Sequence, residues 1–317
     1  MDQLDSMRIF VAVADSQGFA AAARQLRLSA PMVTRAVAAL EKRIGATLLH
    51  RSTRVVRLTE VGERYLADCK RILAELAEAD AQAGGAHVVP QGHLVVTAPV
   101  LFGRMHLAPV LLDFLREHPQ VTANALLLDR VVNLLDEGVD VALRIAHLPD
   151  SSLTAVRVGQ MRRVIVASPD YLREHGEPRQ PADLARHSAV GVSFGGGLAS
   201  PWMLAAEPGQ SGKLVQGPQP HMQLTLNGGE VGIMAARAGH GLARALSYQV
   251  ADDVAAGRLK IVLADHEPPV IPVYLVHAAG RRAAAKVRAF VDFAVARLRA
   301  DPAVSGLSRP SPAGPAN

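Results

Sequence analysis

The sequence predicts an α/β chain with an all-helical N-terminal unit, and three observations lead to this class. Apolar residues recur at helical spacing through roughly the first 85 positions. From His93 onward, short apolar strands alternate with amphipathic helices, which is typical of βαβ units around a mainly parallel sheet. Between these two parts, residues 84–92 hold glycines and a proline, so we expect a linker there.

The composition fits a chain of two or three domains. Its 317 residues, 49% of them hydrophobic, can form sizeable cores. Aromatic residues make up only 4%, which disfavours recognition of RNA or single strands by stacking. Cys69 is the single cysteine, so no internal disulfide can form and a reducing cytoplasm is expected. No signal-peptide pattern and no apolar run of membrane-spanning length is present, so we expect a cytoplasmic protein with no membrane partner.

The first three helices follow one another closely. Residues 2–15 and 19–26 each carry one apolar face and predict two short helices. Ala20 stands where a serine or threonine cap would be expected, so the second helix is predicted to lack a side-chain cap. Arg27 and Leu28 form a tight link to the third helix.

The third helix extends from Ser29 to Gly45. Ser29 is a good N-cap through its hydroxyl, Pro31 falls in the first turn where its missing N–H costs nothing, and Gly45 ends the helix. The predicted buried face consists of Val33, Val37, Leu40 and Ile44, and the predicted solvent face of Met32, Thr34, Arg35, Ala38 and Lys42. Two short helices joined this tightly, the second with a basic outer face, make a helix-turn-helix that can enter a DNA major groove.

Charge separates this interpretation from an ordinary helical hairpin in an enzyme. Residues 24–57 contain eight arginines and lysines, against Glu41 as the only acid. The mutual repulsion of these positive charges does not favour folding, whereas the positive charge attracts a phosphate backbone. Residues 46–59 add two short apolar strands around a turn of arginines, which predicts a wing with a basic tip. The predicted contacts with double-stranded DNA are Ser29, Ala30, Pro31, Met32, Thr34, Arg35, Arg51, Arg54 and Arg57, with Arg35 as the candidate reader of a guanine edge.

A long amphipathic helix follows the wing. Thr59 can cap it, and residues 60–83 would span ~36 Å. Its apolar stripe resembles a coiled-coil seam and consists of Val61, Tyr65, Cys69, Ile72, Leu76, Ala79 and Ala83. We expect this stripe to pair with a second copy of the chain, parallel or antiparallel. Cys69 is interpreted as a small buried hydrophobe and not as a redox sensor.

The remainder predicts strands and helices in alternation. Strands are expected at 93–98, 121–128, 139–145, 163–167, 188–192, 222–226, 242–246, 259–262 and 270–277. Helices are expected at 105–117, 131–137, 230–238, 248–256 and 282–299. The Pro/Ser/Gly-rich residues 301–317 predict a disordered tail.

The chain resembles the LysR-type transcriptional regulators. The residues that carry the resemblance are Phe10-x-x-Val13-Ala14, Gly18-Phe19, Ala22-Ala23-x-x-Leu26, Leu28-Ser29-x-Pro31-x-Val33-Thr34-Arg35, Leu40-Glu41, Leu48-Leu49-x-Arg51 and Leu58-Thr59-Glu60-x-Gly62. The resemblance implies a winged helix-turn-helix (1–59), a dimerisation linker helix and hinge (60–91) and a two-lobed effector domain like a periplasmic binding protein (92–300). Lobe one would comprise 92–162 and 268–300, and lobe two 163–267. A homodimer or homotetramer is implied, and RNA polymerase stays open as a further partner.

A small-molecule effector is expected between the lobes, beyond the carboxyl ends of the strands. The candidate contacts are Pro99, Val100, Leu101, Phe102, Asp129, Arg144, Ile145, Ser193, Phe194, Trp202, Asn227 and Gly228. Arg144 has two interpretations, as the partner of a ligand carboxylate or as part of a structural salt bridge. Phe102 and Trp202 favour an aromatic or apolar ligand, although each is more often simply core.

Other chemistry is weakly indicated. Residues 191–195 match G-x-S-x-G, but the residues after Ser193 make a poor helix, so no catalytic residue is predicted. The twelve histidines and single cysteine show no metal-ligand spacing, so neither a metal nor a cofactor is expected. Two classes remain: a ligand-responsive transcription regulator, or a small-molecule enzyme or solute-binding protein with an unrelated helical N-terminus. The second class leaves the local charge unexplained.

Overall fold

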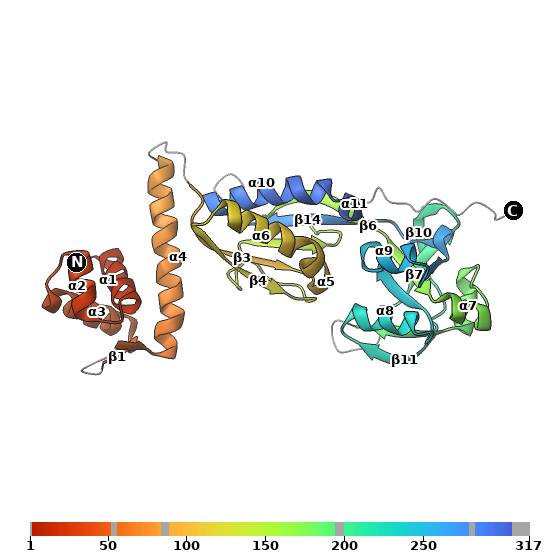
Figure 1. Cartoon of the computed structure of the whole chain (residues 1–317), viewed down its shortest axis with the longest axis horizontal. Coiled ribbons are helices and arrows are strands. Elements are labelled where there is room, and N and C mark those ends of the chain that lie inside the picture. The colour runs from red at the N-terminus through yellow and green to blue at the C-terminus, as the bar shows by residue number, and fades with distance from the viewer. Residues whose placement is uncertain (1, 52–55, 84–88, 194–199, 279–282, 306–317) are drawn as a thin grey trace. The chain divides into compact units, whose positions relative to one another are not determined.

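Figure 1 shows the computed structural model of the chain, which describes residues 2–51, 56–83, 89–193, 200–278 and 283–305. The chain divides into two compact units at residues 93 and 94. We describe each unit separately.

The first unit is helical with one small hairpin. Its elements are α1 (Gln3–Asp15), α2 (Phe19–Leu26), α3 (Ala30–Ile44), β1 (Leu49–Arg51), β2 (Val56–Leu58) and α4 (Glu60–Ala83). Strands β1 and β2 pair antiparallel, with Leu49 opposite Leu58. The predicted helices, the wing and the long helix are therefore confirmed. Arg27 adopts the left-handed conformation that makes the tight turn between α2 and α3.

The helix ends differ in detail from the expectations. Ser29 occupies the N-cap position of α3, but its hydroxyl accepts no capping hydrogen bond. The N-cap of α2 is Gly18 and not Ala20, and it offers no side-chain cap. Thr59 does cap α4, because its Oγ1 accepts a hydrogen bond from Gly62 N at 2.9 Å. At the end of α3, Ile44 is 37% exposed, so the predicted buried face stops one turn earlier, at Leu40.

In the first unit, α4 packs against α1, and this changes the interpretation of the apolar stripe of α4 that was expected to pair with a second chain. Cys69 is wholly buried in that core, and Tyr65 and Ile72 pack against it. The rings of Phe10 and Tyr65 lie 5.8 Å apart. The expectation that these residues face a second chain is therefore wrong for Cys69, because its own unit already covers it.

The second unit contains two sheets. The first has the order β4-β3-β5-β14-β6, formed by β3 (Gly92–Ala98), β4 (Val121–Leu127), β5 (Val141–Ile145), β6 (Thr154–Met161) and β14 (Ile271–His277). β3 runs parallel to β5, whereas β14 runs antiparallel to both β5 and β6. This sheet is mixed and not mainly parallel, because β14 returns into it from the second sheet in the opposite direction.

The second sheet joins a three-stranded and a two-stranded group. The three-stranded group has the order β12-β7-β13. Its central strand β7 (Arg163–Ala167) pairs antiparallel with both β12 (Ala243–Leu246) and β13 (Lys260–Val262). The pair is β11 (His221–Leu226) parallel to β8 (Ser188–Val192), and a parallel bridge from Ala189 to Leu242 links it to the three-stranded group. A separate hairpin, β9 (Met203–Glu207) with β10 (Gln210–Gln216), was not predicted, and neither was β6.

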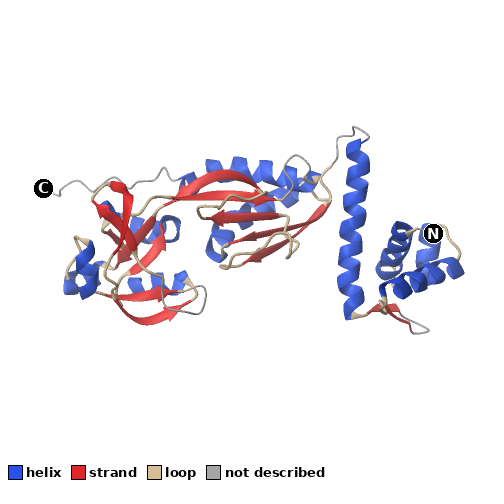
Figure 2. Cartoon of the chain, turned by 180° about the vertical axis from the view of Figure 1, so that it is seen from behind, coloured by secondary structure: helices blue, strands red, loops and turns tan. Residues whose placement is uncertain are grey.

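Helices cover these sheets, as seen from behind in Figure 2. They are α5 (Val100–Phe102), the π-helix η1 (Gly103–Leu107), α6 (Ala108–Glu117), α7 (Pro169–His175), the 3₁₀ helix η2 (Pro181–Arg186), α8 (Gly229–Arg237), α9 (Ser247–Ala255), the 3₁₀ helix η3 (Ala264–His266), α10 (Ala285–Ala300) and α11 (Pro302–Ser305). The helix expected to begin at Met105 therefore begins at Val100. The π-turn before Pro109 accommodates a residue that cannot donate its own helical hydrogen bond.

Two further predictions of local structure differ from the structure. Residues 131–137 form turns and not a helix, because Asn133 uses its side chain on Asp136 and on the backbone N–H of Leu135. The expected tail begins with α11, where Val304 is fully buried. The rest of that tail, from residue 306, lies outside the described residues.

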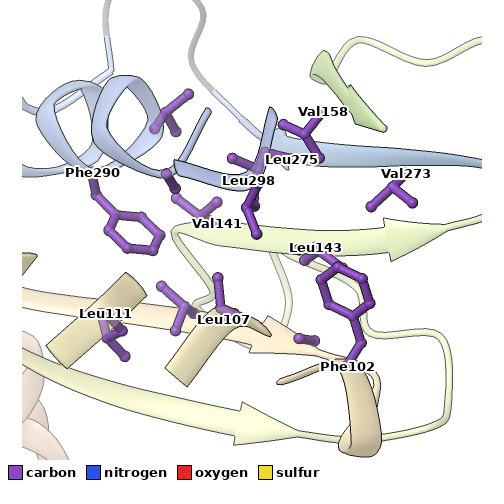
Figure 3. Close-up of a cluster of buried hydrophobic side chains, with 14 of the residues drawn as sticks. Phe102, Leu107, Leu111, Val141, Leu143, Val158, Val273, Leu275, Phe290 and Leu298 are labelled. Carbon is purple, nitrogen blue, oxygen red and sulfur yellow. The ribbon is translucent and has the colours of Figure 1, made fainter. Parts of the chain in front are cut away.

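The main core of the second unit lies between the first sheet and the helices α6 and α10 (Figure 3). Phe290 of α10 packs edge-on against Phe114 of α6, with ring centroids 5.2 Å apart. Two chain crossings connect the sheets, one at Arg162 and one between η3 and β14. A bidentate ion pair joins these crossings: Arg162 Nε donates to Glu267 Oε2 at 2.8 Å and Arg162 Nη2 donates to Glu267 Oε1 at 2.5 Å.

Candidate functional site

The outer face of α3 is the first candidate site. Ser29, Ala30, Pro31, Met32, Thr34 and Arg35 are all exposed there. The apolar positions Val33, Val37 and Leu40 are buried on the opposite face and hold the helix against α1 and α2. In this structure Arg35 lies back along its own helix, with Nε donating to Pro31 O at 3.3 Å. Its terminal nitrogens remain available for a base edge or a phosphate.

The one acid of this basic stretch is turned away from that face. Glu41 Oε1 accepts hydrogen bonds from Leu48 N at 2.9 Å and Leu49 N at 3.1 Å. Its charge therefore fixes the start of the wing against α3. On the exposed face, Arg35 makes no ion pair with a described carboxylate, which favours a polyanionic partner.

The wing supplies one further described cation. Arg57 of β2 is exposed. The backbone of Arg51 lies in β1, while its side chain and the whole of Arg54 are outside the described residues. The wing tip predicted to touch phosphate therefore stays a prediction.

The second candidate site is a cavity of about 830 Å³ in the second unit. It lies beyond the carboxyl ends of β3, β5, β8 and β11, where a ligand site was expected. Its volume is in the range of ordinary small-molecule pockets. Eight of the predicted residues line it, namely Pro99, Val100, Leu101, Asp129, Arg144, Ile145, Asn227 and Gly228.

Local contacts hold the predicted lining residues in place. Asp129 Oδ1 accepts a hydrogen bond from Val100 N at 3.0 Å, so it fixes the first turn of the helix beside the cavity. Arg144 Nη2 donates to Val132 O. Arg144 therefore supports the 128–140 segment through a backbone hydrogen bond and also lines the cavity. It makes no salt bridge with a described carboxylate, so the expected structural salt bridge is replaced by this hydrogen bond, and contact with a ligand carboxylate stays a prediction.

Three described residues that were expected in the site are not among its lining. Phe102 is fully buried in the main core, beside Tyr248. Trp202 is 2% exposed and belongs to the core on the side of α7. Ser193 is buried just after β8, with its N–H donating to Leu226 O at 2.9 Å. The expectation that Phe102 and Trp202 contact the ligand is therefore corrected, because both side chains pack in hydrophobic cores. Phe194 lies outside the described residues.

Several residues of the cavity were missed from the sequence. The polar ones are Thr97, Arg130, His147, Arg163, Glu230, Arg244, Tyr248 and Gln249. Burial raises the pKa of Tyr248, so its phenol stays protonated. A sequence signal existed for two of them, because Arg163 and Arg244 interrupt the otherwise apolar strands RVIVA and LARAL.

Metal and membrane sites were searched within the described residues. No group of three histidine, cysteine, aspartate or glutamate side chains is placed to hold a metal ion in those ranges. No helix in the same ranges is both long and apolar enough to cross a bilayer.

Comparisons with known proteins cover both parts of the chain. The model described as bacterial regulatory helix-turn-helix protein, lysR family, matches residues 4–63. The LysR substrate binding domain model matches residues 87–299. An HTH-type transcriptional regulator of Xanthomonas campestris pv. campestris (strain 8004) is 35% identical over 94% of this chain and 86% of its own length.

A solved relative matches almost the whole chain. The structure of CrgA, a LysR-type transcriptional regulator from Neisseria meningitidis, is 31% identical and covers 94% of this chain and 99% of its own, with a TM-score of 0.57. CrgA of Neisseria meningitidis serogroup C (strain 8013) is 32% identical over 93% of this chain and 96% of its own sequence. The matches therefore extend through both units.

Proposed function

Because the chain belongs to the LysR-type transcriptional regulators, we propose that it reads duplex DNA with the exposed face of α3 and responds to a small molecule held in its cavity. The chain is a regulator and not an enzyme. The alternative of an enzyme or solute-binding protein with an unrelated N-terminus is therefore set aside.

The observation that carries the proposal is the solvent-facing N-terminal half of α3, which presents Arg35 within the basic stretch of residues 24–57. A helix that presents Thr34 and Arg35 outward, on a unit whose single acid in the basic stretch is engaged with backbone amides, fits the major groove. Arg35 is the proposed base reader, and Arg57 is a proposed contact with the phosphate backbone. Arg54 keeps this second role as a prediction from the sequence.

The long helix supports an assembly of two or more chains. The stripe of α4 that covers its own unit through Tyr65, Cys69 and Ile72 continues to Leu76, which lies on the same helix face and is half-buried. We propose that this continuation, and not the part already covered, contacts a second copy. Two recognition helices would then face an interrupted inverted repeat. A tetramer and a contact with RNA polymerase are further steps of the same proposal.

The test begins with selection of duplexes from a random pool by the full chain. Affinity for the selected duplex and for a scrambled one is then measured for the wild type, Arg35→Ala and Arg64→Ala. Arg64 is the control, because it is an exposed arginine of α4 paired with Glu60. We expect Arg35→Ala to lose ~1–3 kcal/mol on the selected duplex and to relax one base preference.

Two results would contradict the proposal. One is that selection enriches no sequence although the protein is folded. The other is that Arg35→Ala binds the selected duplex as tightly as Arg64→Ala does, since the reader would then lie elsewhere. The salt dependence of binding should be steep for the wild type, because contacts with phosphates release counterions.

A further inference from the structure

Two arginines share one face of the second sheet at the cavity. β7 and β12 pair antiparallel, with Arg163 opposite Leu246 and Ile165 opposite Arg244. Residues that are directly opposite, or two positions apart on one strand, point to the same side of a sheet. Arg163 and Arg244 are therefore diagonal neighbours on one face, at a Cα separation of roughly 7–8 Å. Both line the cavity.

Neither guanidinium has an acidic partner. Within the described ranges, no carboxylate lies within ion-pair distance of Arg163 or Arg244. Arg244 Nη1 donates to Pro201 O at 2.7 Å, and its guanidinium lies 6.0 Å from the centre of the Trp202 ring. A guanidinium carries five N–H donors, so most of the donors of both side chains are left for a ligand.

The other charges of the cavity do not neutralise this pair. Of the two lining acids, Asp129 accepts a hydrogen bond from Val100 N at 3.0 Å, and Glu230 pairs with Arg104 at 2.6 Å. Among the lining cations, Arg130 pairs bidentately with Glu137. Arg144 donates to a backbone carbonyl and has no acid beside it among the described residues. The cavity therefore holds an excess of positive charge around Arg163 and Arg244.

This charge is unfavourable in the unliganded protein. Burial, followed by the charge of Arg163, lowers the pKa of Arg244 to about 10. Burial also lowers the pKa of Arg163. Both groups stay cationic at neutral pH, so two like charges are held near each other with reduced hydration. Keeping such a pair without a partner costs stability, which favours a role in binding over a role in folding.

We infer that the cavity binds a small organic acid whose carboxylate is held by Arg163 and Arg244 together. Guanidinium forks match a carboxylate in charge and in planar geometry. The apolar side chains of Leu101, Ile145 and Leu246 line the same space and would contact the body of the acid. This inference rests on the proposed function, because it takes the cavity to be the effector site.

The uncapped start of α8 adds a weaker attraction in the same cavity. Gly228 and Gly229 line it at the N-terminus of a nine-residue helix whose N-cap makes no side-chain hydrogen bond. A Cβ placed on Gly228 would meet no atom within 4 Å. There is therefore room for a ligand beside this helix end, whose first N–H groups would favour the same anionic end of the ligand.

The test uses carboxylic acids paired with their own primary amides, which have nearly the same shape and no charge. Benzoate, phenylacetate, hexanoate and succinate, each at ~10 mM, are compared with the matching amides by thermal melting of the full chain. We expect at least one acid to raise the Tm while its amide does not. Its affinity is then measured by calorimetry in four variants.

The variants separate binding from folding. Arg163→Gln and Arg244→Gln should each weaken binding of the acid by at least ~10-fold, because a charge-assisted contact is lost. Arg244→Lys should recover only part of that loss, since it restores the charge without the fork. Arg116→Gln, an exposed site on α6, should bind like the wild type. Arg163→Gln, which removes no hydrogen bond or ion pair of the described protein, should melt at or above the wild-type temperature.

Three results would overturn the inference: no acid of the panel raises the Tm, the amides bind as well as the acids, or Arg163→Gln and Arg244→Gln both bind the acid as tightly as the wild type. A separate readout tests the proposed function. If an acid binds through these arginines and leaves the affinity for the selected duplex unchanged, effector control fails while the inference stands. If a neutral compound in the cavity changes that affinity and the acids do not bind, the inference fails and effector control stands.

Discussion

Gly62 shows how a single residue fixes the base of the long helix. A Cβ at this position would lie 2.0 Å from the carbonyl oxygen of Leu48, a backbone atom that cannot move aside cheaply. We expect Gly62→Ala to destabilise the first unit by about 2 kcal/mol or more. Hydrogen exchange of α1 and α4 in the full chain measures this, with Glu63→Ala at an exposed neighbouring position as control. Equal protection in the two variants would contradict the close contact.

His187 makes the stability of the second unit depend on pH. It is buried, its Nδ1 lies 3.0 Å from Tyr171 Oη, and burial, followed by the charge of His175, lowers its pKa. The unfolded chain therefore binds a proton at higher pH than the folded chain does. As pH falls from 7 through the interval below the ordinary histidine value, stability should decrease by up to about 1.4 kcal/mol per pH unit.

The comparison is between His187→Gln and His221→Gln, because His221 is exposed on β11. His187→Gln should make the dependence of Tm on pH shallower between roughly pH 7 and 5, whereas His221→Gln should keep it in full. The slope that remains in His187→Gln is assigned to His277, because burial lowers the pKa of that residue as well. The same slope in both variants would place the titrating group elsewhere.

At the residue scale, the exposed face of α3 was predictable and part of the cavity was not. The exposure of Arg35 follows from helical spacing alone, because the apolar positions fix which side is buried. Trp202 and Phe102 were placed in the site because large aromatic residues occur in pockets and cores alike, and only packing decides between them. Arg163 and Arg244 become a pair only through the register of two strands far apart in sequence.

Among the elements, the two chain crossings depend on one ion pair. Arg162 and Glu267 are 17% and 15% exposed and join the crossings by two hydrogen bonds. Arg162→Leu should leave the carboxylate of Glu267 buried without its partner and cost about 3 kcal/mol. The double variant with Glu267→Leu should recover much of this loss.

Denaturant unfolding of the full chain, followed by hydrogen exchange in β6 and β14, reports the effect at the crossings. Arg116→Leu, at an exposed arginine, is the matched control. If Arg162→Leu is no more destabilising than Arg116→Leu, or if the double variant is worse than either single one, the pair does not hold the crossings.

The long helix α4 carries a prediction about assembly. Leu76→Glu would place a charge on the proposed contact and should shift the protein toward monomers that bind the selected duplex poorly. Ala67→Glu introduces the same charge on the opposite, exposed face of the same helix, about two and a half turns before Leu76, and should leave assembly intact. Light scattering that gives the same mass for Leu76→Glu and the wild type would refute the contact.

Some features of the helices and turns could not be predicted from the spacing of apolar residues. The stripe of α4 was read as a seam between chains, but a periodic pattern records only that a face is buried, not what buries it. The helix that begins at Val100 was expected to begin at Met105. Its true start is held by a hydrogen bond to Asp129 from another loop, and this contact cannot be predicted from the spacing of apolar residues. Residues 131–137 were expected to form a helix because their apolar residues have helical spacing. That spacing does not show that Asn133 and Glu137 make local side-chain hydrogen bonds which compete with the helical ones.

For the whole molecule, the family resemblance predicted more of the domain organisation than the periodicity of apolar residues did. Alternating strands and helices indicated parallel sheets, whereas β14 and the antiparallel three-stranded group around β7 make both sheets mixed. The resemblance placed the lobe boundaries after residues 162 and 267, and the structure has the chain crossings at Arg162 and between η3 and β14. Chain reversal between lobes is a property of the complete fold and leaves little trace in local patterns.

The central claim is that one chain couples occupancy of its cavity to its affinity for a specific duplex. Such coupling requires a ligand that binds one arrangement of the protein more tightly than another. The most direct measurement is a titration of the full chain with the selected duplex and with a scrambled one. Each is done with and without a saturating amount of the compound that raises the Tm most. We expect the affinity for the selected duplex to change at least ~5-fold on saturation, while weak binding to the scrambled duplex stays the same. Equal affinity for the selected duplex with the cavity filled and empty would contradict it.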